Sequence, residues 1–225
     1  MKPERANRRR PARLYWAVLA PLAAALLAYS QAVAYFGNES FHLLASQLIN
    51  AGKTPYLEFF YQHPPLFIYL NAGWMRFFGE TWRSAHILSA LLTGGCIVVV
   101  ASYVFNRLFD APWRLEISAM IAALLGFNFY VITYGTVALP FGLCLLLTVV
   151  SFRLTVEAVQ RSGALLAFLA GLSCGGSAAS SFLTAPVPVV LFVWLALNNL
   201  AGARVRKCLA FAGGAVVPFF PLLWL

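Results

Sequence analysis

Long apolar runs separated by short polar breaks dominate the chain, and this pattern predicts a bundle of membrane-spanning helices. Several runs approach the roughly 20 apolar residues that a helix needs to cross a bilayer. The hydrophobic pattern predicts seven such helices, over residues 14–36, 84–105, 115–134, 135–151, 163–180, 184–200 and 208–225. The predicted fold class is therefore an all-α polytopic membrane protein with about seven transmembrane helices.

Composition supports the same class. The 225 residues are 61% hydrophobic and only 10% charged, whereas soluble domains average about 25% charged residues. Such a chain cannot cover a globule with polar side chains, so we expect lipid to be its main solvent. The four cysteines lie in or beside apolar runs without C-x-x-C or metal-finger spacing, which favours small buried side chains in helices.

The placement of basic residues predicts the orientation. With seven spans and a cytoplasmic N-terminus, thirteen of the sixteen Lys and Arg residues fall on the cytoplasmic side, and only Lys53, Arg76 and Arg83 fall outside. Basic residues beside spans are retained in the cytoplasm. This predicts a basic cytoplasmic tail over residues 1–13, a membrane domain over 14–225, and a long non-cytoplasmic loop over 37–83. The expected location is the plasma (inner) membrane.

Two alternatives concern the ends of the chain. The first apolar run could be a cleavable signal peptide, but its length and its heavily basic flank favour a retained helix. The last run stops at Leu225 with no polar flank. We therefore expect a fragment or a truncated product, incomplete at the C-terminus. The net charge of +9 lies beside the spans, so no nucleic-acid partner is expected.

The external loop 37–83 carries the candidate chemistry, because long loops on a rigid scaffold commonly hold functional residues. Its first part predicts an amphipathic interfacial helix with Asn38 as N-cap, Glu39 in the first turn and Gly52 at its end. A second interfacial helix is predicted from Leu66 to about Phe78, after Pro64 and Pro65.

Acidic and histidine side chains in this loop have two interpretations. Glu39 can simply favour the helix dipole, or it can accept a proton or hold a metal where the site opens to the outside. His42 shares a helix face with Glu39. No cofactor is assigned with certainty, and a divalent metal is the one candidate, with His42, Glu58 and His63 as its ligands.

The order of motifs brings in a family resemblance. "NESFHLLASQLINAGKTPYLEFFYQHPPLFIYLNAGWMRFFG", followed by "RSAHILSALLTGGCIVVVASYVFNRLF", resembles membrane glycosyltransferases of the GT-C fold. These are related to dolichyl-phosphate-mannose protein mannosyltransferases and include the RgtA/B/C/D-like domains. The resemblance covers most of residues 14–150 and implies the N-terminal part of a GT-C fold. It further implies a polyprenyl-phosphate-linked sugar donor, and transfer to a lipid, glycan or protein acceptor on the non-cytoplasmic face.

The resemblance also implies roles for loop residues. Glu39 matches the second member of the family's Asp–Glu pair and is the candidate catalytic base or acceptor-orienting group, whereas Asn38 replaces the first member and cannot accept a proton usefully. The candidate substrate-binding residues are Asn38, Lys53, Tyr56, Glu58, His63 and Arg83. Among them, Lys53 and Arg83 are candidates for neutralising the donor phosphate, and Tyr56 for stacking on the sugar.

Two other function classes stay open. Asn38, the abrupt end, and Phe141 in a segment where the family often has a charged residue favour an inactive relative that binds a lipid-linked sugar or a partner. A transporter is the third reading, but the middle of spans two to seven carries no charged residue. The small residues of 171–181 are explained more simply by close helix packing.

Overall fold

The computed structural model describes residues 4–34, 37–108, 110–161, 163–199 and 203–223, and these are all-helical apart from one isolated bridge between Pro55 and Phe59. In this described part the elements are α1 (Glu4–Ala32), α2 (Glu39–Asn50), α3 (Leu66–Phe78), α4 (Trp82–Arg107), α5 (Arg114–Gly126), α6 (Phe129–Gly135), α7 (Phe141–Gln160), α8 (Ala164–Ala178), η1 (Phe182–Thr184), α9 (Pro186–Leu197), α10 (Arg204–Val216) and η2 (Val217–Leu223). The predicted all-helical class is confirmed for these residues.

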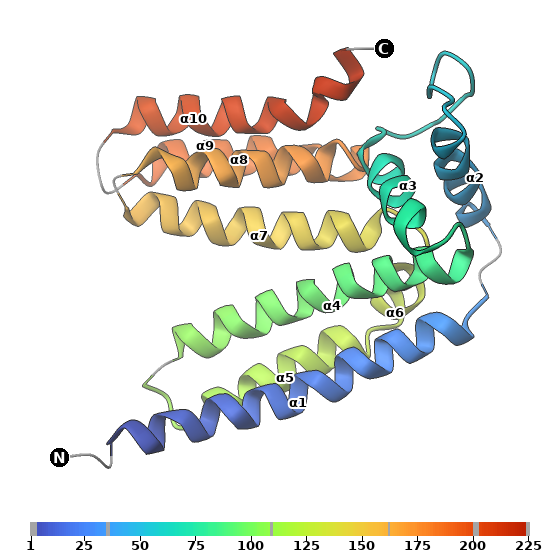
Figure 1. Ribbon diagram of the computed structural model, residues 1–225. Helices are drawn as coiled ribbons and strands as arrows, with labels where there is room; N and C mark the ends of the chain where they lie inside the picture. The colour runs from blue at the N-terminus through green and yellow to red at the C-terminus, as the bar shows by residue number, and fades with distance from the viewer. Residues whose placement is uncertain (1–3, 35–36, 109, 162, 200–202, 224–225) are drawn as a thin grey trace.

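The long helices form a bundle in which successive members run in opposite directions (Figure 1). The start of α1 and the α4–α5, α7–α8 and α9–α10 links lie together, and we call this the basic end. It contains Arg107, Arg114, Arg161 and Arg204. The segments α2, α3 and α6 and the α8–α9 link lie at the opposite end, which we call the loop end (Figure 1). The arginines of the helix links are therefore separated along the bundle axis from the predicted external loop, which itself carries Lys53, Arg76 and Arg83.

Three described helical segments are long and apolar enough to cross a membrane: Tyr15–Ala32, Trp82–Arg107 and Phe141–Gln160. The bent pair α5 and α6 makes a fourth if it is counted as one span, while α8 and the segment Phe182–Leu197 are shorter apolar helices. A helix thus lies in each of the seven predicted ranges, but three or four meet the length and hydropathy expected of a span.

The prediction of one straight helix over 115–134 is wrong. The chain bends by 59° between α5 and α6. Asn128 starts the second helix, since its side-chain oxygen accepts hydrogen bonds from the N–H groups of Tyr130 and Val131 at 3.0 and 3.2 Å. The next predicted helix also starts later than expected, because residues 136–140 form a buried connection and α7 begins after Pro140.

Glycine sets the closest packing in the bundle. A Cβ atom at Gly175 would lie 2.1 Å from the carbonyl oxygen of Ala215, and one at Gly171 would lie 2.0 Å from that of Phe211. The backbones of α8 and α10 therefore touch only because these positions lack side chains. This confirms the packing interpretation of the small residues near 171.

The two loop helices form close to where the sequence predicts them. Asn38 is the N-cap residue of α2, but its side chain makes no capping hydrogen bond, so that part of the prediction is wrong. Gly52 follows the helix end with a φ of +82°, a conformation that favours glycine. Between the helices, Asn71 Nδ2 donates to Ser46 Oγ at 3.0 Å, and the N–H of Leu66 donates to the carbonyl of Ala179 at 3.1 Å. These bonds fix α3 against α2 and against the end of α8.

Candidate functional site

Glu39 is a buried carboxyl group at the loop end, in the first turn of α2. Its side chain is only 5% exposed. Glu39 Oε1 accepts a hydrogen bond from the backbone N–H of Ala138 at 2.9 Å and forms a second, short hydrogen bond with His86 Nε2. A buried carboxylate needs such partners, because desolvation without them is costly. Glu39 is therefore held by two segments that lie far from it in the sequence.

The contact of the second ring nitrogen of His86 limits the protonation states that the Glu39–His86 pair can adopt. His86 Nδ1 lies 2.7 Å from the backbone carbonyl oxygen of Ser30 in α1, and a carbonyl can only accept. Nδ1 must therefore carry a proton. One further proton lies between Nε2 and the Glu39 carboxyl, so the pair is either imidazolium with carboxylate or neutral imidazole with carboxylic acid.

The segment that supplies the Ala138 N–H is fixed by its own burial. Residues 135–140 are all buried. At its start, Thr93 Oγ1 donates to the carbonyl of Gly135 at 2.5 Å, which ties the segment to α4. A Cβ atom at Gly142 would lie 2.8 Å from Thr93 Oγ1, so α7 approaches α4 closely just beyond the segment. The short non-helical stretch is enclosed by protein, the setting in which such backbone is tolerated inside a membrane.

His42 is the centre of a second cluster, one turn further along α2. Its Nδ1 lies 2.8 Å from the hydroxyl of Tyr61, and its ring stacks on that of His63 with centroids 5.4 Å apart. Burial, together with the neighbouring His63, lowers the pKa of His42 to about 4. Burial also raises the pKa of the Tyr61 hydroxyl well above its usual value. Both groups are therefore neutral at physiological pH, and His42 is not an acid or base near neutrality.

Lys53 and Glu58 form an exposed ion pair in the loop after α2. Lys53 Nζ lies 2.8 Å from Glu58 Oε1, and the N–H of Thr54 donates to Glu58 Oε2 at 2.7 Å. The hydrogen bond from Lys53 is the main reason that the pKa of Glu58 is lowered, and the same bond raises the pKa of Lys53. These contacts close the turn over residues 53–58.

Tyr56, in that turn, holds the loop to His63. Its hydroxyl donates to the backbone carbonyl of His63 at 2.5 Å, and burial raises the pKa of this hydroxyl to about 12. Its φ of 67° is unusual for a residue with a side chain. Tyr56 therefore shapes the loop that follows α2.

The predicted three-residue metal set is not assembled. In the described part of the chain, no group of three or more His, Cys, Asp or Glu side chains could hold a metal ion. His42 and His63 stack face to face, while Glu58 is bonded to Lys53 and Thr54. The sequence placed these residues within one loop, but it did not reveal that each already has another partner.

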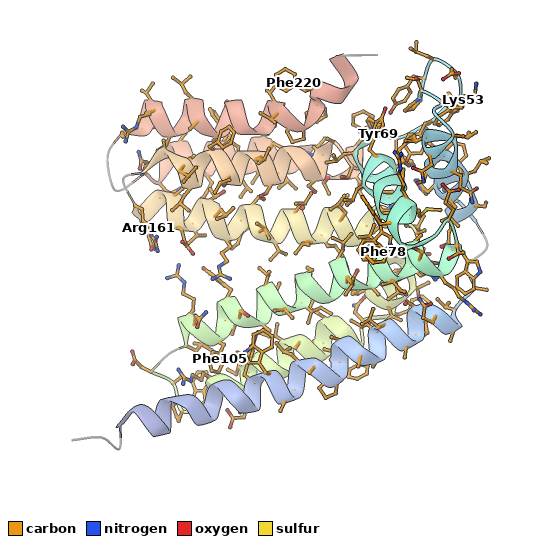
Figure 2. All side chains as sticks on the ribbon, in the orientation of Figure 1. Lys53, Tyr69, Phe78, Phe105, Arg161 and Phe220 are labelled. Atoms are coloured by element: carbon orange, nitrogen blue, oxygen red, sulfur yellow. The ribbon has the colours of Figure 1, made fainter. Side chains whose placement is uncertain are left out.

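The predicted substrate-binding residues fall into separate groups. Asn38 is exposed and lies at the start of α2, next to Glu39. Arg83 is exposed and lies at the start of α4. Lys53 and Glu58 follow the other end of α2, and a 12-residue helix is about 18 Å long. Figure 2 shows Lys53 at the outer tip of the loop. Glu39 and the Lys53–Glu58 pair therefore do not form one compact site.

Two cavities lie beside this region. One, of about 570 Å³, has lining residues from α2 and from the turn into α4: Ser40, Leu43, Leu44, Gln47, Glu80, Thr81, Trp82 and Arg83. Here the guanidinium of Arg83 lies over the ring of Trp82, 5.2 Å from its centre. The other, of about 320 Å³, is apolar and is lined by Tyr130, Val131, Tyr134, Gly135, Phe141 and Leu145 of α6 and α7. Both can receive a ligand with apolar parts.

His86 is the residue that the sequence analysis did not single out. It lies in the second turn of α4, inside an apolar helix, where a buried histidine is most simply expected to satisfy a local contact. The available signal was an ionisable side chain within a predicted span, which commonly marks a functional or paired position. Compared with known proteins, the chain matches no family model, no curated protein and no solved structure.

Proposed function

We propose that this protein is an integral membrane glycosyltransferase, related to the GT-C enzymes, that moves a sugar from a polyprenyl-phosphate donor to a lipid, glycan or protein acceptor. The site lies on the non-cytoplasmic face of the plasma membrane in this proposal. The chain crosses the membrane seven times, with the basic end in the cytoplasm and the loop end outside. The separation of the basic end from α2 and α3 along the bundle supports this orientation.

One observation carries the proposal: the hydrogen bond from Ala138 to Glu39 joins two of the motif segments that bear the family resemblance. The first is the start of the external loop, and the second is "YGTVALPFGLCL", which resembles a family segment but departs from its pattern at Thr136 and Phe141. His86, from the helix that follows the loop, joins the same carboxyl group. Three segments of the resemblance thus meet at one buried acid, as a catalytic centre requires.

In the proposed reaction, an acceptor hydroxyl attacks the anomeric carbon of the donor, the bond to the lipid phosphate breaks, and the hydroxyl proton passes to a carboxylate. Glu39 accepts that proton when its partner His86 is the imidazolium. The hydrogen bonds from His86 and Ala138 to the carboxyl both go to Oε1, so Oε2 is the oxygen that receives the proton in this proposal.

The cavity lined by Ser40 and Arg83 supports the placement of the donor phosphate. Ser40 follows Glu39 directly, and Arg83 is three residues before His86, so the two lie on one face of α4. The guanidinium supplies positive charge for the leaving phosphate. The neighbouring apolar cavity with Tyr134 and Phe141 suits a polyprenyl chain or the face of a sugar ring.

Glu39→Gln tests the proposal directly. Membranes that contain the wild-type protein and a radiolabelled polyprenyl-phosphate sugar are expected to form product, and the variant is expected to form none at an equal protein level. Arg83→Gln is expected to raise the KM for the donor, while Lys53→Gln, at the far end of α2, serves as the matched control. Unchanged turnover in Glu39→Gln would remove Glu39 from the mechanism.

A second candidate function is a non-catalytic relative that binds a lipid-linked sugar or a partner. Asn38 and the engagement of Glu39 by His86 and Ala138 favour it, since a buried acid held by two partners can be purely structural. Retention of the radiolabelled donor by purified protein, without product from any of several lipid-linked sugars, selects this function over transfer.

A further inference from the structure

A groove between α4, α7 and α9 is separate from the site at the loop end. Its volume is about 330 Å³, and its lining residues are Val99, Val100, Tyr103, Thr148, Val149, Phe152, Arg153, Val187 and Leu191. Figure 1 shows α4 and α7 diverging toward the basic end. Phe152 is 48% exposed although it belongs to the groove wall. The lining is almost wholly apolar, with one charged member, Arg153.

The polar groups around the groove are mostly arginines. Arg107 is exposed at the end of α4 and donates from Nε to the hydroxyl of Tyr103 at 3.2 Å. Arg153 lies 3.8 Å from Glu157, and this carboxylate also lies 3.5 Å from Arg161. Figure 2 shows Arg161 at the basic end, beyond the groove. Arg153 and Arg161 thus share one carboxylate, and Arg107 is hydrogen-bonded to the lining residue Tyr103, so positive charges outnumber negative ones around the groove.

We infer that this groove binds an anionic phospholipid, with one acyl chain between α4 and α7 and the phosphate against Arg153 and Arg107. An acyl chain matches an open groove of aliphatic and aromatic side chains, because it covers them without polar groups to satisfy. A phosphate matches arginine in charge and in hydrogen-bond geometry. A purely apolar occupant, such as another helix face, would not use the excess positive charge beside the groove.

This inference does not rest on the proposed sugar transfer. The groove lies beside the middle of α7 and shares no residue with the cavities at the loop end. It implies that the leaflet at the basic end supplies a bound lipid that fills the gap between the α4 and α7 halves of the bundle. Each arginine near a charged bilayer surface contributes roughly 1 kcal/mol to anionic lipid binding, which corresponds to about a five-fold change in affinity.

Native mass spectrometry of the purified protein in detergent tests the inference. We expect added phosphatidylglycerol to bind several-fold more tightly than phosphatidylcholine with the same acyl chains. Arg153→Gln is expected to lower phosphatidylglycerol binding about five-fold, and Arg153→Lys to retain most of it. Arg204→Gln is the matched control, because Arg204 lies at the same end of the bundle but outside the groove.

Val149→Trp tests the chain-binding part, since an indole at this wall residue fills the groove. It is expected to lower the binding of both lipids, with an unchanged elution volume in size-exclusion chromatography as the check on folding. Equal binding of the two lipids by the wild type would overturn the inference. So would equal losses in Arg153→Gln and Arg204→Gln, or a stable dimer that excludes lipid and is broken by Val149→Trp.

Discussion

Glu39 and Ala138 are 99 positions apart, yet the N–H of Ala138 donates to Glu39 Oε1 at 2.9 Å inside the protein. The same oxygen contacts His86, whose other nitrogen faces the carbonyl of Ser30. Residues of α1, α2, α4 and the α6–α7 connection therefore meet at the Glu39–His86 pair. Removing any one partner would leave a buried polar group without a hydrogen bond, and the desolvation of that group would then destabilise the fold.

The Glu39–His86 pair is expected to show strong coupling in stability. His86→Leu leaves the acid buried beside an apolar group, which costs about 1–3 kcal/mol if the pair is neutral and about 3–5 kcal/mol if it is an ion pair. The double variant His86→Leu, Glu39→Leu is expected to recover most of that loss, because both polar groups are then gone. Unfolding in detergent, followed by circular dichroism, measures both free energies. A double variant no more stable than the single one would show that the pair is not coupled.

Helix contact between α8 and α10 predicts a sharp difference between two glycines. Gly175→Ala places a Cβ atom 2.1 Å from the carbonyl oxygen of Ala215, so the helices must separate. Overpacking of this kind typically costs about 1–3 kcal/mol. Gly213→Ala, on α10, meets nothing within 4 Å and is expected to be neutral or to stabilise the helix by about 0.5–1 kcal/mol. The thermal unfolding midpoint is expected to fall in Gly175→Ala and to stay unchanged or rise in Gly213→Ala.

The depressed pKa of His42 predicts a loss of stability in acid. In the folded protein this imidazole stays neutral down to a pH of about 4, whereas the unfolded chain binds the proton near pH 6.5. Its contribution is therefore fully present above pH 6.5 and is lost as the pH falls toward 4, by an amount on the order of 3 kcal/mol. His42→Phe should flatten this part of the stability curve. Histidine NMR titration of wild-type protein gives the pKa itself, and a value near 6.5 would contradict the prediction.

The orientation of the bundle is tested by cysteine labelling in a variant without native cysteines. Leu57, in the loop beyond α2, is 69% exposed, and Arg161 is exposed at the basic end. Leu57→Cys is expected to react with a membrane-impermeant maleimide on intact cells, and Arg161→Cys only after lysis. The reverse result would put the loop in the cytoplasm and remove the basis for transfer on the outer face.

Much of the helical pattern could be predicted from the sequence. A helix lies in every range where the apolar run predicts one, because hydrophobicity over some 20 residues is a local property that needs no knowledge of the fold. The bend between α5 and α6 escaped this reading. Asn128 interrupts a run whose average hydrophobicity remains high, so composition alone does not reveal the break. The new helix starts there because the Asn128 side chain accepts two backbone hydrogen bonds.

Part of the candidate site could be predicted too. Glu39 was singled out from its position after the first apolar run, and the structure buries it at the loop end. Its engagement by His86 could not be predicted, since the two residues are 47 positions apart and meet only when α2 folds against α4. The proposed metal ligands His42, Glu58 and His63 failed for the same reason: nearness in sequence did not decide which partner each side chain would meet.

The sequence by itself determined that this protein is helical and apolar, and that most of its basic residues fall in the N-terminal tail and in alternate helix links, because both follow from residue type along the chain. Only the tertiary structure decided which groups share a proton, which glycines allow helices to touch, and where grooves remain. Those features depend on contacts between segments that are distant in the sequence, and only the packing of the folded chain brings these segments together.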